Sequence, residues 1–155
     1  MSEGPFTRLF SPWGRIRSIF EASHTDSTSA SPAQVWALWG DPARWPDWNE
    51  QVESVEPEGD LAVGQRFKVK LRRGGRMEFQ IVELEPERVF VDESKLPGAR
   101  LGHEYRVQPK GKGAEITHRI YVRGPFSGLF SLLLGRKRMT ESVVRFVERE
   151  KELVE

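Results

Sequence analysis

Apolar and polar residues alternate through most of this chain with the period of two that half-buried strands show. The alternation covers the segments 16–28, 52–57, 65–72, 76–84, 88–95, 100–108 and 114–123. Short turns that contain proline or glycine separate the last six segments, which is the spacing of an antiparallel meander. The pattern therefore predicts seven strands in one antiparallel sheet.

Helical patterns interrupt and follow these strands. Ser31 can cap a helix that opens with proline, and Gln34 can close a capping box, so a short helix is expected after the first strand. A second short helical turn should hold Trp45 and Trp48. Beyond residue 125 apolar residues recur every three or four positions, which predicts a short piece, a break at Gly135 and a long helix over about 139–153.

The faces of two strands predict the turn between them. Val69 and Leu71 share one face, Met77 and Phe79 share another, and the two sets match if Leu71 lies opposite Met77. That register leaves a three-residue loop over 73–75 with a glycine in the left-handed conformation. We therefore expect this hairpin form and not a two-residue Gly-Gly turn.

The order of the predicted elements is β-α-α-β6-α. Strands followed by a helix that must bury a broad apolar stripe on the sheet define an α+β layer fold. At 155 residues the chain fits one domain. We assign residues 15–155 to this domain and residues 1–14 to an N-terminal extension, whose apolar side chains could dock on the domain or on a partner.

Four motifs point to a known family. They are Ser-Pro-Ala-Gln-Val-Trp over 31–36, Trp-Pro-Asp-Trp over 45–48, Val-Gly-Gln-Arg-Phe over 63–67 and Gly-Pro at 124–125. In these motifs the chain resembles the START/Bet v 1-like (SRPBCC) superfamily and, within it, the bacterial polyketide cyclase/dehydrase and lipid-transport group, over about residues 20–153. The resemblance implies a helix-grip fold, in which a curved seven-stranded sheet with two short helices closes on a long C-terminal helix over a small-molecule pocket. A shared fold does not transmit a shared activity.

Three histidines are the most informative polar residues. His103 and His118 alternate with apolar residues on two strands joined by a hairpin, which places them opposite or diagonal to each other. The resemblance puts the first strand beside the last, so His24 and Asp26 would lie near them in the pocket. Imidazole binds zinc and titrates near neutral pH, so a metal site or an acid/base pair is one interpretation. We favour the other, a set of polar groups that orient a ligand without metal or cofactor.

Asp92 belongs to the same pocket in one of two registers. If the chain turns at the preceding Pro-Glu pair, Phe90, Asp92 and Ser94 point inward. The opposite register would bury Val89 and Val91 instead.

The complete set of candidate ligand-binding residues combines these polar groups with apolar walls. They are His24, Asp26, Phe67, Val69, Phe79, Phe90, Asp92, His103, Tyr105, His118, Leu129, Phe130 and Leu133. Leu129, Phe130 and Leu133 would close one end of the cavity or form a lip that touches a membrane transiently. Trp36 and Trp39 should serve mainly in packing, while a later tryptophan could flank the mouth.

Charge and composition exclude several functional classes. Lys and Arg number 24 against 23 Asp and Glu, so the net charge of +1 creates no overall field for nucleic acid or membrane. Basic stretches at 68–76 and 136–138 have the pattern of solvated faces, and nucleic acid is not an expected partner. The absence of cysteine excludes disulfides, thiolate catalysis and sulfur-ligated metals, and fits a cytoplasmic protein. No apolar run suffices for a signal peptide or stable membrane insertion.

Three functional hypotheses remain. We expect a carrier or sensor that encloses a small hydrophobic or amphipathic molecule, lipid-like or polyketide-like, between the sheet and the C-terminal helix. The alternative is a cyclase or dehydratase in which a pocket histidine or Asp26 moves a proton, although no nucleophile motif or phosphate loop favours an enzyme. The third is an accessory protein that binds a partner through residues 1–14. The oligomeric state is open.

Overall fold

A seven-stranded antiparallel sheet forms the body of the protein, as the alternation predicts. The computed structural model describes residues 20–56 and 60–155, so the boundary expected near residue 14 lies outside the described part. The strands are β1 (Phe20–Thr28), β2 (Val52–Glu56), β3 (Arg66–Leu71), β4 (Arg76–Glu85), β5 (Val89–Leu96), β6 (Ala99–Lys110) and β7 (Gly113–Arg123). Their order in the sheet is β1-β7-β6-β5-β4-β3-β2, and all neighbours are antiparallel. The fold is therefore the predicted α+β helix-grip.

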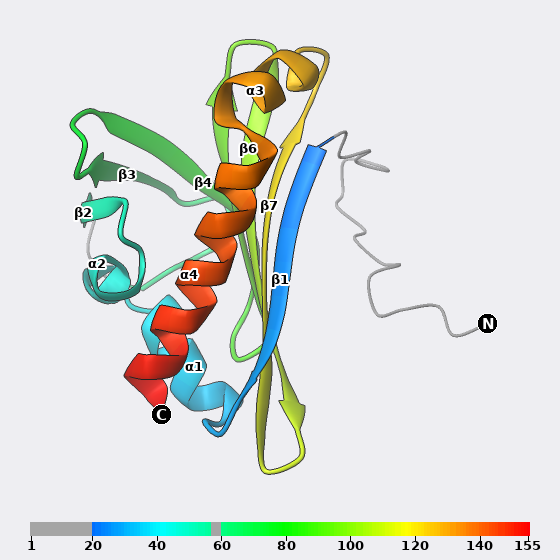
Figure 1. Cartoon of the computed structure of the whole chain (residues 1–155). Coiled ribbons are helices and arrows are strands. Elements are labelled where there is room, and N and C mark those ends of the chain that lie inside the picture. Colours follow the sequence, from blue (N-terminus) through cyan, green and yellow to red (C-terminus); the bar gives the residue numbers. More distant parts are fainter. Residues whose placement is uncertain (1–19, 57–59) are drawn as a thin grey trace.

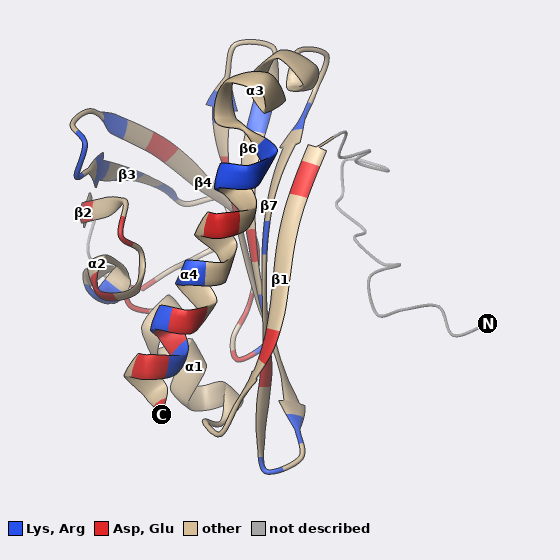
Figure 2. Cartoon of the chain, in the orientation of Figure 1, with Lys and Arg blue, Asp and Glu red and all other residues tan. Residues whose placement is uncertain are grey.

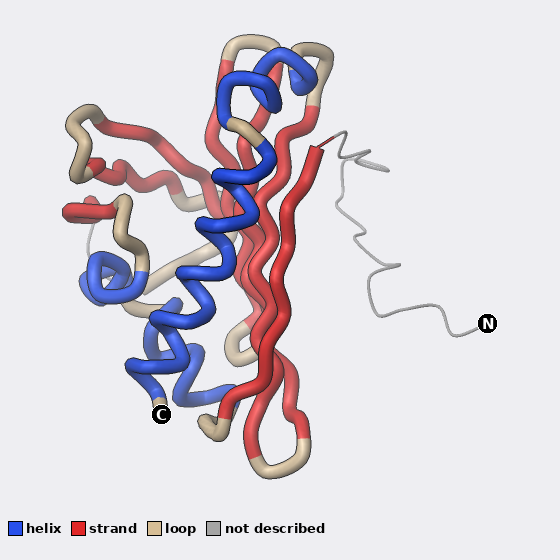
Figure 3. Tube along the Cα trace, viewed as in Figure 1, coloured by secondary structure: helices blue, strands red, loops and turns tan. Residues whose placement is uncertain are grey.

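Helices cover one face of this curved sheet. The helices of the described residues are α1 (Pro32–Trp39), the short 3-10 turn η1 (Pro42–Arg44), α2 (Trp45–Trp48), α3 (Ser127–Leu134) and α4 (Arg136–Val154). The long helix α4 runs along β1 and β7, and α1 and α2 lie beside its C-terminal half (Figure 1, Figure 3). The turn end of the β3–β4 hairpin leans away from β6 and β7 (Figure 1).

The predicted helix starts and stops follow local chemistry. Ser31 Oγ accepts a hydrogen bond from the Gln34 backbone N–H at 3.2 Å, and Gln34 Oε1 accepts one from the Ser31 N–H at 2.9 Å. This is the capping box read from the sequence. Gly135 separates α3 from α4 with a φ of +74°, a conformation that glycine adopts without steric cost. The long helix begins at Arg136, three residues before the predicted start.

The register of the β3–β4 hairpin corrects one prediction. Val69, not Leu71, lies opposite Met77, so the predicted pairing is wrong by two residues. A loop of three residues is present, but it spans 72–74, because the Leu71 N–H already donates to the Gly75 carbonyl at 3.0 Å. Gly74 and Gly75 both adopt the left-handed conformation, with φ of +95° and +87°. The prediction assumed one such glycine, and the second allows the chain to turn one residue sooner. A shift of two leaves every side chain on its predicted face.

Strand β5 is buried on both faces, which explains why two registers suited its sequence. Phe90 and Asp92 face the helices, with Phe90 opposite Leu84 after an irregularity in β4. Val89 and Val91 are also buried, on the other face of the sheet with Tyr121. Of the inward set that we expected from a turn at the Pro-Glu pair, Phe90 and Asp92 line the cavity. Ser94 does not line it, and its hydroxyl donates to the Glu78 carbonyl at 2.8 Å.

Candidate functional site

An aromatic cavity lies between the concave face of the sheet and the α1–α2 segment. Its lining comes from β3 to β6 and from the tryptophan-rich helices, and consists of Trp39, Trp45, Trp48, Asn49, Gln51, Val52, Phe67, Val69, Leu71, Met77, Phe79, Phe90, Asp92, Leu101, His103 and Tyr105. The cavity has a volume of about 90 Å³ that is open to water molecules. Since one water needs roughly 10–15 Å³ on this measure, the cavity holds several waters or one compact ring system.

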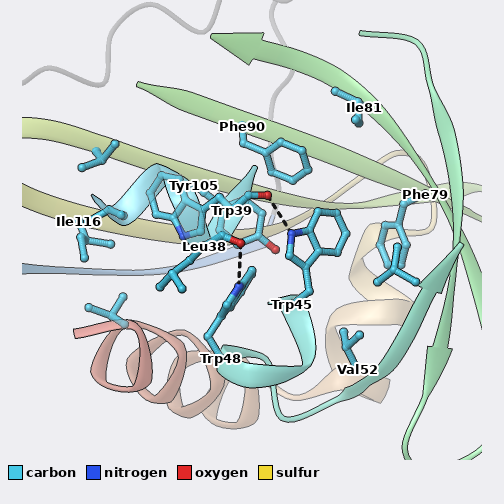
Figure 4. Close-up of a cluster of buried hydrophobic side chains, with 14 of the residues drawn as sticks. Leu38, Trp39, Trp45, Trp48, Val52, Phe79, Ile81, Phe90, Tyr105 and Ile116 are labelled. Carbon is cyan, nitrogen blue, oxygen red and sulfur yellow. Dashed lines mark hydrogen bonds between the residues drawn. The ribbon is translucent and has the colours of Figure 1, made fainter. Parts of the chain in front are cut away.

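Two of the three cavity tryptophans donate hydrogen bonds to backbone carbonyls. Trp45 Nε1 donates to the Trp39 carbonyl at 2.8 Å, and Trp48 Nε1 donates to the Leu38 carbonyl at 3.4 Å (Figure 4). Trp45 also packs edge-to-face on Phe67, with ring centroids 5.1 Å apart. Because the indole N–H groups have partners, burying the rings leaves no donor unpaired, and the rings present fixed apolar surfaces to the cavity.

One hydrogen-bonded pair supplies the main polar feature of this wall. Asp92 and His103 are register partners on β5 and β6, and Oδ1 of Asp92 lies 3.0 Å from Nδ1 of His103. Burial raises the pKa of the Asp92 carboxyl above its usual value, and the nearby His103 offsets part of that effect. With Nδ1 donating to the carboxylate, Nε2 of His103 is the ring nitrogen that can accept a hydrogen bond from a ligand or take a proton.

Tyr105 adds a donor two residues along β6. The ring lies against Trp39 and Phe90, and burial, followed by the charges of Asp92 and Glu150, raises the pKa of its hydroxyl well above 10.0. The phenol therefore stays protonated. The hydroxyl makes no hydrogen bond to the described residues, so it can donate one to a molecule in the cavity.

His118 lies outside the cavity lining, which corrects the expectation that it faces the cavity beside His103. Tyr105 is its register partner, so His103 and His118 are diagonal, one of the two predicted arrangements. Nε2 of His118 lies 3.0 Å from Oε2 of Glu150 on α4, and Trp39 Nε1 donates to Oε1 of the same carboxylate at 2.9 Å. The side chains of His118 and Glu150 are 2 % and 0 % exposed. Glu150 thus ties the C-terminal helix to the sheet.

His24 and Asp26 also lie away from the cavity, contrary to our expectation. His24 is the register partner of His118 on β1, and neither residue belongs to the lining. Asp26 sits at the edge of the sheet, where Oδ2 accepts a hydrogen bond from Lys151 Nζ at 2.9 Å. That bond lowers the pKa of the Asp26 carboxyl. The inward parity of β1 was predicted correctly, but α4 covers this strand and separates it from the cavity.

The expected apolar lip does not close the cavity either. Leu129 and Leu133 are 56 % and 68 % exposed, and no residue of α3 lines the cavity. Phe130 packs instead on a second apolar cluster that includes Val122, Met139 and other residues between α4 and the sheet. Of the residues in this cluster, only Leu101 also lines the cavity.

Seven of the predicted residues therefore meet around the cavity, and several lining residues were missed. The seven are Phe67, Val69, Phe79, Phe90, Asp92, His103 and Tyr105. The largest omission is Trp39, which we assigned to packing, whereas it both packs and lines the wall. Glu150 does not line the cavity, but its buried role was missed as well. It shares the apolar face of α4 with Val143 and Val147, and an acid at such a position indicates a buried hydrogen-bond partner.

The buried carboxyl of Asp92 predicts a pH-dependent cost to stability. Its pKa in the folded state lies above the unfolded value of 3.8, so the folded state binds more protons between these two pKa values. The protein therefore loses stability as the pH rises from 3.8 through the pKa of the folded state. Asp92→Asn removes the ionisation but keeps an oxygen that can accept from His103. We expect this variant to unfold at a higher urea concentration than the wild type at pH 7, with the difference vanishing below pH 3.8. An unchanged difference across this range would contradict the assignment of the cost to Asp92.

Two further properties of the described residues bear on function. Within residues 20–56 and 60–155, no three His, Asp or Glu side chains are placed to share a metal ion. No helix in the same part of the chain is both long enough and apolar enough to cross a membrane.

Comparisons with known proteins place this architecture in a wider group. A family model described as polyketide cyclase / dehydrase and lipid transport matches residues 20–155. No curated protein matches the sequence significantly.

Solved structures with the same fold have low sequence identity. Protein MLL2253 from Mesorhizobium loti is 16% identical with a TM-score of 0.69, and the match covers 86% of this chain and 96% of that one. Truncated norcoclaurine synthase from Thalictrum flavum is 17% identical with a TM-score of 0.66, over 87% and 92% of the two chains. Protein TTHA0849 from Thermus thermophilus is 20% identical with a TM-score of 0.65, over 87% and 97%. At these identities the similarity shows the fold alone.

Proposed function

Because the chain belongs to the polyketide cyclase/dehydrase and lipid transport family, we propose that it binds a compact amphipathic molecule in its aromatic cavity, as a carrier or sensor. The observation that supports this most is the His103–Asp92 pair, a polar feature set into a wall of aromatic rings. Ligand pockets have this composition, with a few polar groups that orient an otherwise apolar molecule.

The shape and chemistry of the cavity favour a ring over a long acyl chain. Trp45, Phe79 and Phe90 present fixed aromatic surfaces, on which a planar ring packs in edge-to-face or offset geometry. A hydroxyl or carbonyl on that ring would meet Nε2 of His103 and the phenol of Tyr105. The reachable volume of about 90 Å³ suits one small polyketide-like ring system better than an extended lipid tail.

A matched pair of probes tests this orientation. 4-Methylphenol and toluene have the same ring and differ in one hydroxyl. Nε2 of His103 would accept a hydrogen bond from this hydroxyl. In NMR titrations followed through the tryptophan indole N–H signals, we expect 4-methylphenol to bind more tightly than toluene. His103→Phe should weaken 4-methylphenol about tenfold, the worth of one buried hydrogen bond, and leave toluene nearly unchanged.

His24→Phe is the matched control, because His24 lies outside the cavity lining and should leave both affinities unchanged. If neither probe perturbs the indole signals, or if His103→Phe leaves the preference for 4-methylphenol intact, the proposed site is wrong. Native mass spectrometry of freshly purified protein would show in addition whether a small molecule accompanies it.

A second candidate function is proton-transfer catalysis of the cyclase or dehydratase kind. The specific observation in its favour is the hydrogen bond between Asp92 and His103. Because the Asp92 carboxylate accepts from Nδ1, Nε2 of His103 is the nitrogen that could act as a base on a molecule in the cavity. Tyr105 would stabilise a developing oxyanion. The third hypothesis, a partner bound through residues 1–14, lies outside the described residues. Deleting that segment and measuring pull-down or self-association would test it.

A further inference from the structure

Helix α3 presents a large apolar surface to solvent. Among the described residues, five large apolar side chains are exposed, and four of them belong to α3 or to the residue before it: Phe126 at 57 %, Leu129 at 56 %, Leu132 at 82 % and Leu133 at 68 %. The fifth is Val63, in the β2–β3 loop. The opposite side of α3 already packs on the protein through Phe130 and Leu134. The exposed side of α3 therefore does not take part in the apolar core. A contiguous exposed apolar surface of this kind marks an interaction site.

Basic residues surround this apolar surface. Arg136, Lys137 and Arg138 follow α3 directly and are all exposed, with the Lys137 side chain at 91 %. They form the basic band at the end of α4 beneath α3 (Figure 2). The β5–β6 turn lies at the same end of the protein, because the Phe126 N–H donates to the Gly98 carbonyl at 3.0 Å. Lys95, which is exposed near the end of β5, lies beside that turn.

The acidic groups at this end do not neutralise the basic band. Glu93 is buried and already accepts hydrogen bonds from Arg123 and Tyr121. Glu21, near the start of β1, is half-exposed and already accepts a hydrogen bond from Arg119. Glu141 lies 4.0 Å from Lys137, and both side chains are exposed to solvent. Such a long, exposed ion pair offsets little of the Lys137 charge. Neither Arg136 nor Arg138 has an ion pair with the described residues. The α3 end is thus apolar at its centre and positive around it.

We propose that α3 docks the protein on an anionic lipid surface. An uncharged apolar helix followed by clustered Lys and Arg has the composition of a segment that lies in the membrane interface, with its apolar face among the acyl chains and its basic residues on the headgroups. A helix of eight residues is too short to span the bilayer, so the contact is peripheral. This inference does not depend on what the cavity binds.

Charge favours this occupant over two others. A second copy that docked through the same end would bring two basic bands together, which costs free energy. Residues 1–19 carry Arg8, Arg15 and Arg17 against Glu3, so this segment is also basic and does not complement the α3 end. Anionic headgroups supply the complementary charge for the Lys and Arg side chains near the membrane surface.

Co-sedimentation with vesicles tests the proposal on the full chain. We expect the protein to pellet with vesicles of equimolar phosphatidylcholine and phosphatidylserine and to remain in the supernatant with phosphatidylcholine alone. Leu132→Ser with Leu133→Ser should reduce partitioning at least tenfold, because both exposed side chains would enter the interface. Lys137→Glu with Arg138→Glu should reduce it by at least tenfold as well.

Matched controls separate docking from damage to the fold. Val63→Ser changes an exposed apolar residue in the β2–β3 loop, and Lys112→Glu reverses a charge at the β6–β7 turn, at the opposite end of the sheet from α3. Both controls should sediment like the wild type, and circular dichroism should show all variants folded. Wild-type protein that stays in the supernatant with both vesicles, or variants and controls that partition alike, would overturn the proposal. A wild-type dimer that the Leu132→Ser, Leu133→Ser variant makes monomeric, without vesicle binding, would assign the surface to self-association instead.

Discussion

Replacing Glu150 with alanine should lower the free energy of unfolding by about 3–5 kcal/mol, the cost of removing one member of a buried hydrogen-bonded ionisable pair. The Glu150 side chain is 0 % exposed and accepts hydrogen bonds from Trp39 Nε1 and His118 Nε2. Truncation leaves both of these groups buried without a partner and opens a void beneath α4. Chemical denaturation followed by circular dichroism measures the change.

Two further variants decide whether the hydrogen bonds cause this loss. Glu148→Ala removes an exposed carboxylate from the same helix and should change stability by less than about 0.5 kcal/mol. Glu150→Gln keeps an oxygen that can accept from Trp39 and fills nearly the same volume, so it should lose clearly less stability than Glu150→Ala. Equal losses for Glu150→Ala and Glu148→Ala would show that the buried network does not hold α4 on the sheet.

If the cavity catalyses proton transfer, His103→Phe should slow a model reaction by about 10²–10⁴-fold, the usual worth of a positioned general base. A suitable probe is 2-tetralone, whose aromatic ring suits the cavity and whose ketone has exchangeable α-protons. Nε2 of His103 would take an α-proton and leave the enolate, and the Tyr105 hydroxyl would donate a hydrogen bond to its oxygen. Return of a deuteron from D₂O to the carbon completes the exchange, which NMR measures.

The remaining variants distinguish catalysis from binding alone. Tyr105→Phe should slow the exchange by about a hundredfold through loss of the oxyanion donor. His24→Phe should leave the rate unchanged, because His24 lies outside the cavity. Exchange no faster than in buffer, or equal in the wild type and His103→Phe, would remove the catalytic candidate and leave the binding function to stand on the 4-methylphenol measurements.

Local features of the sequence predicted most of the fold because short-range physics decides them. The alternation along β3, β4, β6 and β7 shows which side of each strand is buried, and Ser31 with Gln34 contains the whole capping interaction within four residues. Gly135 marked the break between α3 and α4 for the same reason. Even the incorrect hairpin register kept the correct faces, since an error of two residues preserves the period.

The composition of the site depended on contacts that no local pattern contains. His103 and His118 have the same alternating surroundings in the sequence, yet one faces the cavity and the other is buried. The difference arises because Glu150, 32 positions after His118 and 111 after Trp39, is carried by α4 onto the sheet. The sequence by itself determined the strands, the capped start of α1, the break at Gly135 and the inward faces. Only the tertiary structure decided which inward residues meet helix α4 and which are left facing the cavity, because that choice is made by the long-range packing of α4 on β1 and β7.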